Sequence, residues 1–302
     1  MRLFSLHFGL VDVFAREPLS GNGLSIFLLE HELPFELMQH ITQEMRQFES
    51  IFLRKTDNPH RYIARIFTME EELGFAGHPI LGAACYLHAK NFRGVDELKL
   101  DFVTPEKTIP TVSVINTPDN FAWMEQGEAI FREPLDSTQT KELLSALTLS
   151  ETDVAENLPL QVVSTGLPYL IVPVSKGLSR ACINTPQFES LLADVGAKFV
   201  YVLDISMKEG RTWDNNGKVE DIATGSAAGP AAAYLVKHGL ARFDDVILIK
   251  QGRFVGRPSE LHACVRNDSG FMVTVKGQVC FVGEGSIKLP DQLIHRTAFS
   301  RH

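Results

Sequence analysis

The chain has 302 residues, of which 44% are hydrophobic and 22% charged, and its formal net charge is −8 at pH 7. This length usually forms two domains, and the composition is that of an ordinary soluble globular protein. The acidic balance and the lack of long Lys or Arg runs argue against nucleic acid and anionic membranes as partners, because binding phosphates needs clustered cations.

The first residues, MRLFSLHFGLVDVF, predict a strand and not a signal peptide, because they alternate regularly and carry Asp12 early. No run of about 18 apolar residues occurs anywhere, so no membrane span is expected. The four cysteines are scattered without CxxC spacing. This usage favours reduced, buried thiols and a cytoplasmic protein.

Strands alternate with helices through the first half of the chain. One helix begins at Pro34, where proline is tolerated in the first turn, and its apolar residues recur at helical spacing up to Phe48. A second helix follows the phrase GFAGHP. Apolar or alternating runs bounded by turn residues predict strands, and these lie at 3–14, 24–29, 50–55, 61–67, 96–104 and 108–115.

Residues 116–120, NTPDN, form the most linker-like stretch of the first half. Beyond them, helices are expected at 137–147 and at 186–195, the second of which is closed by Gly196. A further helix follows the phrase TGSAAG. Strands are expected at 160–164, 169–174, 198–204, 245–250, 260–265 and 271–276.

These elements predict an α+β protein with two lobes. We expect residues 1–118 to form the N-terminal lobe, completed by the C-terminal segment 287–302. The C-terminal lobe is then formed by residues 119–286.

Nearly the same phrase occurs twice, as GFAGHPILGAACYLHAK at residues 74–90 and as TGSAAGPAAAYLVKH at residues 224–238. With an offset of 148 positions, five of the 14 residues from 77 to 90 are identical in the two copies. Composition alone would give on the order of one match. The offset is close to half of the chain, which predicts an internal duplication.

Both phrases place a glycine and a polar residue ahead of a helix rich in small side chains. Small residues let other backbone approach, so each helix is expected to lie enclosed by the strands of its own lobe. The first amides of a helix lack intrahelical partners and carry partial positive charge, which suits a carboxylate. Two such helix ends, facing each other across a cleft, would hold a small anionic substrate. The alternative is that Thr224 or Ser226 only caps its helix.

Five segments then follow one another in a characteristic order. They are VDVFAREPLSGNGLSIF, RIFTMEEELGFAGHP, GHPILGAACYL, VEDIATGSAAGP and QGRFVGRPSEL. Together they resemble the phenazine-biosynthesis isomerase family, the PhzF-like proteins, from about residue 10 to residue 285. The resemblance implies the diaminopimelate epimerase fold, in which two pseudo-symmetric lobes each curl a mostly antiparallel sheet around a central helix. It also implies an active site between the lobes and, by resemblance alone, a homodimer.

By position, the resemblance assigns the family's acid–base glutamate to Glu49, its histidine to His78 and its aspartate to Asp221. Each residue also has a simpler interpretation, as a solvated helix-end glutamate, a turn histidine and a loop cap. A carboxyl partly buried beside Phe48 and Ile51 would have a raised pKa, which suits proton transfer to and from carbon. A histidine at a helix N-terminus would act as a neutral donor or relay.

The same resemblance assigns carboxylate binding to the turn formed by Gly225 and Ser226, with Gly77 supplying the matching amide of the first lobe. The sequence also departs from the family pattern at several positions. These departures put the shape of the pocket, and so the substrate, in doubt more than the acid–base chemistry. They are Phe48, Gly74, Trp213 and Ile222.

Other catalytic motifs do not match. GRTWDNNGK lacks P-loop spacing, no GxGxxG opens a helix after a strand, and GSAAG is not a nucleophile elbow. The ten histidines form no zinc pattern, so neither a metal nor another cofactor is expected. Two-thiol racemases of this fold place cysteines where this chain has Ala76 and Thr224.

The sequence therefore predicts a cofactor-independent isomerase that moves a proton within a small carboxylic acid. Two alternatives stay open. One is a protein that binds small carboxylates without turnover, and the other is an epimerase or hydrolase that uses the same cleft.

Overall fold

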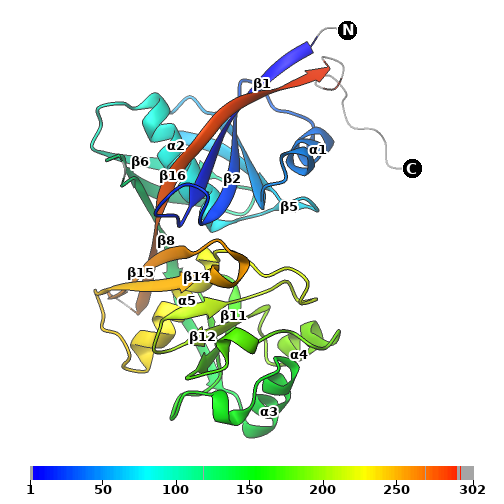
Figure 1. The fold of residues 1–302 in the computed structure, drawn as a ribbon. Helices are drawn as coiled ribbons and strands as arrows, with labels where there is room; N and C mark the ends of the chain where they lie inside the picture. Colours follow the sequence, from blue (N-terminus) through cyan, green and yellow to red (C-terminus); the bar gives the residue numbers. More distant parts are fainter. Residues whose placement is uncertain (1–2, 118, 269, 291–292, 294–302) are drawn as a thin grey trace. The chain divides into compact units, whose positions relative to one another are not determined.

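The computed structural model describes residues 3–117, 119–268, 270–290 and 293, and its many strands and few helices confirm the mixed α+β class (Figure 1). The chain forms two compact units, residues 1–124 with 277–302 and residues 125–276. Both boundaries fall inside long strands, β8 (Phe121–Glu128) and β16 (Phe271–Pro290). Of the expected C-terminal segment 287–302, residues 291–292 and 294–302 lie outside the described part of the chain.

The strands of the first unit form a closed circuit of pairings. Its order is β1-β2-β3-β4-β6-β7-β8-β16, and β16 pairs with β1 again. Figure 1 shows β1, in blue, alongside β16, in red. The remaining strands of this unit are β1 (Leu3–Val13), β2 (Asn22–Leu29), β3 (Glu49–Lys55), β4 (Arg61–Phe67), β5 (Glu72–Leu73), β6 (Glu97–Val103) and β7 (Thr108–Val114).

The helix α2 (Gly77–Asn91) fills the inside of this circuit. It contacts β1, β2, β3, β6 and β7, and 12 of its 15 residues are buried. A Cβ atom at Gly82 would lie 2.6 Å from Leu24 Cδ2, so the Leu24 side chain of β2 packs directly against the helix backbone. The second helix of the unit, α1 (Phe35–Met45), packs on β3 and β4 beside a cluster of phenylalanines.

The second unit also encloses a helix. Its sheet runs in the order β16-β15-β14-β13-β12-β11-β10-β9, and α5 (Gly225–Lys237) contacts β10, β11, β12, β14 and β15 with 11 of its 13 residues buried. The other elements are β9 (Ile130–Pro134), α3 (Ser137–Ala146), β10 (Gln161–Ser164), β11 (Pro168–Val174), α4 (Phe188–Asp194), β12 (Phe199–Asp204), β13 (Glu209–Arg211), β14 (Val246–Gln251) and β15 (Ser259–Asn267).

The two units repeat one order of elements. In the first, α1 connects the parallel pair β2–β3, and the segment with α2 connects the parallel pair β4–β6. In the second, α4 connects the parallel pair β11–β12, and α5 connects the parallel pair β13–β14. In each unit the strands between the two crossovers are antiparallel. The repeated phrase of the sequence thus begins the enclosed helix of each unit.

One detail differs from the elements expected from the sequence. The helix α1 ends at Met45, because Arg46 adopts a left-handed backbone conformation, so Phe48 lies outside it. In the linker-like stretch, residues 116–117 and 119–120 lie in the connection between β7 and β8, where Asp119 N donates to Asn116 O over 2.6 Å. Among the described residues, no helix is long and apolar enough to cross a membrane.

The close packing around α5 gives a first prediction. A Cβ atom added at Gly229 would lie 2.0 Å from Gln126 Oε1, whose amide also donates to Gly225 O over 2.8 Å. We expect Gly229→Ala to lower the free energy of unfolding by about 1–3 kcal/mol, because overpacking outweighs the gain of about 1 kcal/mol in helix propensity. Urea denaturation measures this change.

Gly283→Ala is the control, because an added Cβ meets no atom within 4 Å there. It should change the free energy of unfolding by less than about 0.5 kcal/mol. Equal unfolding midpoints for the two variants would contradict the prediction.

Candidate functional site

A carboxyl group and an imidazole lie together at the N-terminal end of α2. His78 Nε2 is 2.9 Å from Glu49 Oε2, and the two side chains are 7% and 13% exposed. Neither atom has another hydrogen-bond partner among the described residues. The first unit therefore holds an acid–base pair that is largely buried and whose two facing atoms, Glu49 Oε2 and His78 Nε2, make no hydrogen bond to another described residue.

Strand pairing places Glu49 at this position. It is the first residue of β3, and it pairs in parallel with Leu24 of β2, a fully buried residue. Phe48 precedes it and is partly buried. Gly77 and His78 are the first two residues of α2, so the start of the helix and the start of a strand bring the pair together.

The N-terminus of α2 lacks a side-chain cap. Its N-cap residue is Ala76, which has an extended backbone and no capping hydrogen bond. Pro79 in the first turn has no N–H group. The helix dipole adds partial positive charge beside the Glu49–His78 pair, and this favours an anion there.

The start of α5 in the second unit is organised by the turn that precedes it. The N-cap residue Thr224 makes no capping hydrogen bond, and its hydroxyl donates instead to Asp221 Oδ2 over 2.5 Å. The capping role considered for Thr224 is therefore wrong, because no backbone N–H of α5 donates to its hydroxyl oxygen. Asp221 and Ser226 are partly exposed, while Gly225 is buried.

Gln251, the last residue of β14, bridges this turn. Its Nε2 donates to Asp221 O and to Thr224 Oγ1, each over 2.9 Å. The next residue, Gly252, has φ +83°, and a Cβ there would lie 2.5 Å from Ile222 O. Only glycine allows the strand end to approach the turn so closely. Gln251 is not among the site residues predicted from the sequence, although Gln251 is the first residue of the segment QGRFVGRPSEL.

Tyr169 is a second residue that sequence analysis missed, and no sequence signal pointed to it. Its phenol lies 2.7 Å from Ser226 Oγ. Burial raises the pKa of Tyr169, and the hydrogen bond to Ser226 opposes this only in part. The phenol therefore stays protonated and holds the Ser226 hydroxyl at the start of α5.

A buried ion pair supports the strand before this turn. Arg211 binds Glu220 through two hydrogen bonds of 2.9 and 2.6 Å, and both side chains are 9% exposed. The guanidinium carbon lies 4.8 Å from the ring centre of Trp213 and 4.4 Å from that of Phe254. This pair draws the Glu220 side chain into the unit, so Glu220 is not a surface residue. Trp213, a departure from the family pattern, belongs to the hydrophobic core.

The four cysteines are all free, and Cys85 lies inside α2. Burial raises the pKa of the Cys85 thiol. The helix ends themselves carry Ala76 and Thr224. A racemisation by two thiols at these helix ends therefore has no thiol to take up or supply the proton. Among the described residues, no group of three or more His, Cys, Asp or Glu could hold a metal ion.

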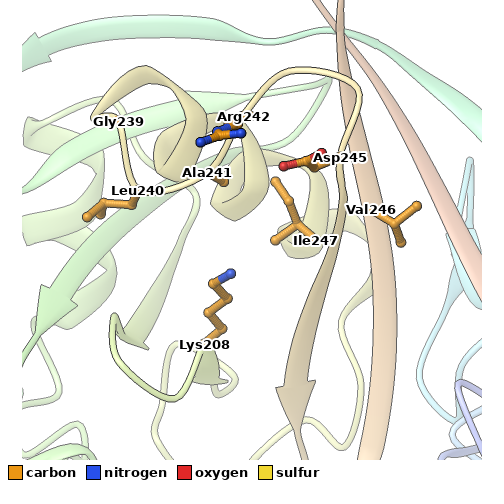
Figure 2. Close-up of a pocket in the computed structure, with 8 residues that line it drawn as sticks. All are labelled: Lys208, Gly239, Leu240, Ala241, Arg242, Asp245, Val246 and Ile247. Atoms are coloured by element: carbon orange, nitrogen blue, oxygen red, sulfur yellow. The ribbon is translucent and has the colours of Figure 1, made fainter.

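A cavity of about 390 Å³ in the second unit does not contain the residues discussed above. It is lined by Lys208 and by residues that follow α5, including Arg242 and Asp245 (Figure 2). The 13 residues of α5 span about 20 Å. This cavity therefore lies near the C-terminal end of α5, while Gly225 and Ser226 lie at the other end.

The six residues proposed from the sequence thus form two groups. Glu49, Gly77 and His78 meet in the first unit. Asp221, Gly225 and Ser226 lie at the start of the corresponding helix in the second unit.

Comparison with known proteins gives matches over nearly the whole chain. The sequence model of the phenazine biosynthesis-like proteins, PhzC–PhzF, matches residues 11–285. The trans-2,3-dihydro-3-hydroxyanthranilate isomerase of Pseudomonas chlororaphis is 31% identical over 296 residues, which cover 94% of this chain and 99% of that protein.

Two solved structures resemble the chain closely. One is a predicted epimerase from Pseudomonas aeruginosa, with a TM-score of 0.86 and 45% identity over 93% of this chain and 99% of that one. The other is a PhzF-family phenazine biosynthesis protein from Bacillus anthracis, with a TM-score of 0.81 and 23% identity over 94% of this chain and 99% of that one. The second match concerns the fold alone.

The Arg211–Glu220 pair gives a second prediction. Arg211→Met should lower the free energy of unfolding by about 3–5 kcal/mol, because it leaves the Glu220 carboxylate buried without its partner. The double variant with Glu220→Gln removes the unpaired charge and should recover part of this loss. Chemical denaturation of the two variants measures the difference, and a double variant no more stable than Arg211→Met would contradict the prediction.

Proposed function

Because the chain belongs to the phenazine biosynthesis-like family, we propose that it is an isomerase that moves a proton within a small carboxylic acid by acid–base catalysis. The prediction of an isomerase is confirmed at the level of the family, since the curated relative is named as one. The proton transfer, the residue roles and the substrate class are the proposal.

The observation that carries the proposal is the partly buried Glu49 carboxyl beside His78 at the start of α2. The Glu49 carboxylate removes a proton from an allylic or α carbon, and the C–H electron pair moves into the adjacent π system. The same carboxyl returns the proton to another carbon of that system. No proton or electron is gained or lost overall, so the step needs no oxidant or reductant.

The remaining residues hold the substrate. His78 and Asp221 orient it, or relay protons at its amine or hydroxyl. The amides at Gly77 and Gly225 and the Ser226 hydroxyl bind its carboxylate, which stabilises the charge that develops as the proton leaves. Support for these roles comes from the position of each group at the start of a buried helix.

The proposed substrates are cyclic carboxylic acids that carry an amine or hydroxyl. The compound named for the Pseudomonas chlororaphis relative, trans-2,3-dihydro-3-hydroxyanthranilate, is of this class. Such a molecule has a carboxylate for the helix amides, polar groups for His78 and Asp221, and a C–H bond next to a double bond for Glu49.

Glu49→Gln tests the catalytic role. We expect kcat to fall about 10²–10⁴-fold, because the amide cannot accept the proton, while substrate binding persists. Steady-state kinetics and calorimetric binding measure the two effects. Glu72→Gln is the control, since Glu72 is a similarly buried glutamate (19% exposed) of the same unit that binds Arg65. A kcat for Glu49→Gln within twofold of this control would contradict the role of Glu49.

Reaction in deuterated water distinguishes the proposed reaction from its alternatives. Candidate acids are first screened by thermal stabilisation, since ligands that bind the folded state raise the melting temperature. With an acid that binds, we expect an isomer with the same carbon skeleton, in which deuterium appears at the new C–H position in those turnovers in which the Glu49 carboxyl exchanges its proton with solvent before returning it. Inversion at one carbon would indicate an epimerase, oxygen-18 uptake from water a hydrolase, and binding without turnover a carboxylate-binding protein.

A further inference from the structure

The turn Asp221–Thr224 before α5 is held by one buried side chain. Gln251 is 1% exposed and makes four hydrogen bonds. Its Nε2 donates to Asp221 O and Thr224 Oγ1, and its Oε1 accepts from Thr224 N over 3.2 Å and from the Tyr201 hydroxyl over 3.1 Å. Every hydrogen-bonding position of the amide group is therefore used.

Two backbone groups fix which end of this amide faces which neighbour. The N–H of Thr224 can only donate, so it must face Gln251 Oε1. The carbonyl of Asp221 can only accept, so it must face Nε2. The opposite orientation of the amide would set donor against donor and acceptor against acceptor. The direction of these hydrogen bonds is thus determined by the backbone itself.

The Thr224 hydroxyl extends this series of hydrogen bonds in the same direction. Because Oγ1 accepts from Gln251 Nε2, its own proton is free to point elsewhere, and it points to Asp221 Oδ2 over 2.5 Å. At the other end, burial raises the pKa of the Tyr201 phenol, and the charge of Asp221 raises it further, so Tyr201 remains a donor. The result is a directed series of hydrogen bonds that starts at Tyr201 and ends at the Asp221 carboxylate.

We propose that Gln251 is a positioning residue for the reaction. It sets the direction of the hydrogen bonds that run from Tyr201 to Asp221, so that the Asp221 carboxyl is held in one orientation as a hydrogen-bond acceptor. The inference rests on the proposed function, in which Asp221 binds the amine or hydroxyl of the substrate. Gln251 acts on the substrate only through Thr224 and Asp221. It also links the backbone of Asp221 to the backbone of Thr224, the N-cap residue of α5.

The consequence is a requirement for an amide, and not only for a polar side chain, at position 251. A carboxylate of the same size could still accept from Tyr201 and from the Thr224 amide. It could not donate, so the Thr224 hydroxyl would face two carboxylates with one proton. Loss of an orienting partner of this kind costs about 10- to 100-fold in the function of the group that it orients.

Gln251→Glu is therefore the test, with Gln161→Glu as the matched control. Gln161 of β10 is also 1% exposed, and its amide donates to Arg132 O over 2.7 Å and lies 3.0 Å from His238 Nε2. His238 is the C-cap residue of α5, so the control makes the same change at the opposite end of the same helix. We expect kcat/KM to fall about 10- to 100-fold for Gln251→Glu and less than threefold for the control.

The pH profile separates positioning from a general loss of structure. A protonated carboxyl regains one donor. The loss of kcat/KM in Gln251→Glu, relative to the unchanged protein, should therefore become smaller as the pH falls through the pKa of the new carboxyl. The new carboxyl contacts the Tyr201 phenol, and the titratable groups that act on that phenol are Tyr169, Asp221 and Glu209. The phenols stay protonated over this range, and the two carboxylates and burial raise the pKa of the new group. Any loss of kcat/KM in the control Gln161→Glu should not vary with pH.

Thr224 supplies a second pair of variants. Thr224→Ser keeps the hydroxyl and should retain kcat/KM within about threefold, whereas Thr224→Val removes it and should lower kcat/KM about tenfold or more. Equal activity of the two Thr224 variants, or a pH-independent deficit of Gln251→Glu equal to that of the control, would overturn the proposal.

A measurement without substrate distinguishes failure of this inference from failure of the proposed function. Amide hydrogen exchange followed by mass spectrometry reports the order of residues 221–226 in the free protein. We expect Gln251→Glu to accelerate exchange there at least tenfold, and Gln161→Glu to leave it unchanged. Unchanged exchange in Gln251→Glu overturns the inference. Faster exchange in a protein that turns over none of the screened acids would refute the proposed function while the role of Gln251 in the turn stands.

Discussion

The architecture depends on enclosing one helix within the strands of each unit. A helix that is surrounded on its sides can carry only small residues where the strands approach most closely, and this is where Gly82 and Gly229 lie. The helix cannot expose a polar face, so its polar groups are confined to its two ends. Enclosure thus concentrates the electrostatic character of α2 and α5 at their termini. The helix termini therefore combine polar groups with an otherwise apolar interior, which is the setting that proton transfer needs.

Strands next to the start of each enclosed helix supply the polar side chains that the helix itself does not carry. At α2, the beginning of β3 brings a carboxyl to the histidine of the first turn. At α5, the end of β14 brings an amide that orders the preceding turn, and β11 brings a phenol to the serine hydroxyl. The helices are related by a repeat in the sequence, yet these surrounding groups differ. The two units therefore share one order of elements, while the side chains at the start of each enclosed helix differ.

Local patterns were sufficient to predict the elements and the class of the fold. Alternation and apolar runs identified the strands, and the repeated glycine phrases identified the enclosed helices. The family motifs pointed to Glu49 and His78, which the structure brings within 2.9 Å of each other. Gln251 and Tyr169 could not be found in this way, because their importance comes from pairing across strands and turns far apart in the sequence. Glu220 shows the same limit, since its burial depends on an arginine nine residues earlier that is flanked by aromatic rings.

The pairing of β1 with β16 has a consequence for how the protein is made. The circuit of the first unit closes only when β16 pairs with β1, so it stays open until the residues of β16 have been synthesised. The middle of the chain contains every segment of the second unit and is released earlier. Domains generally fold as units during synthesis. In this protein the unit formed by residues 125–276 can fold first, whereas the strands of the first unit must wait for β16 before their circuit is complete.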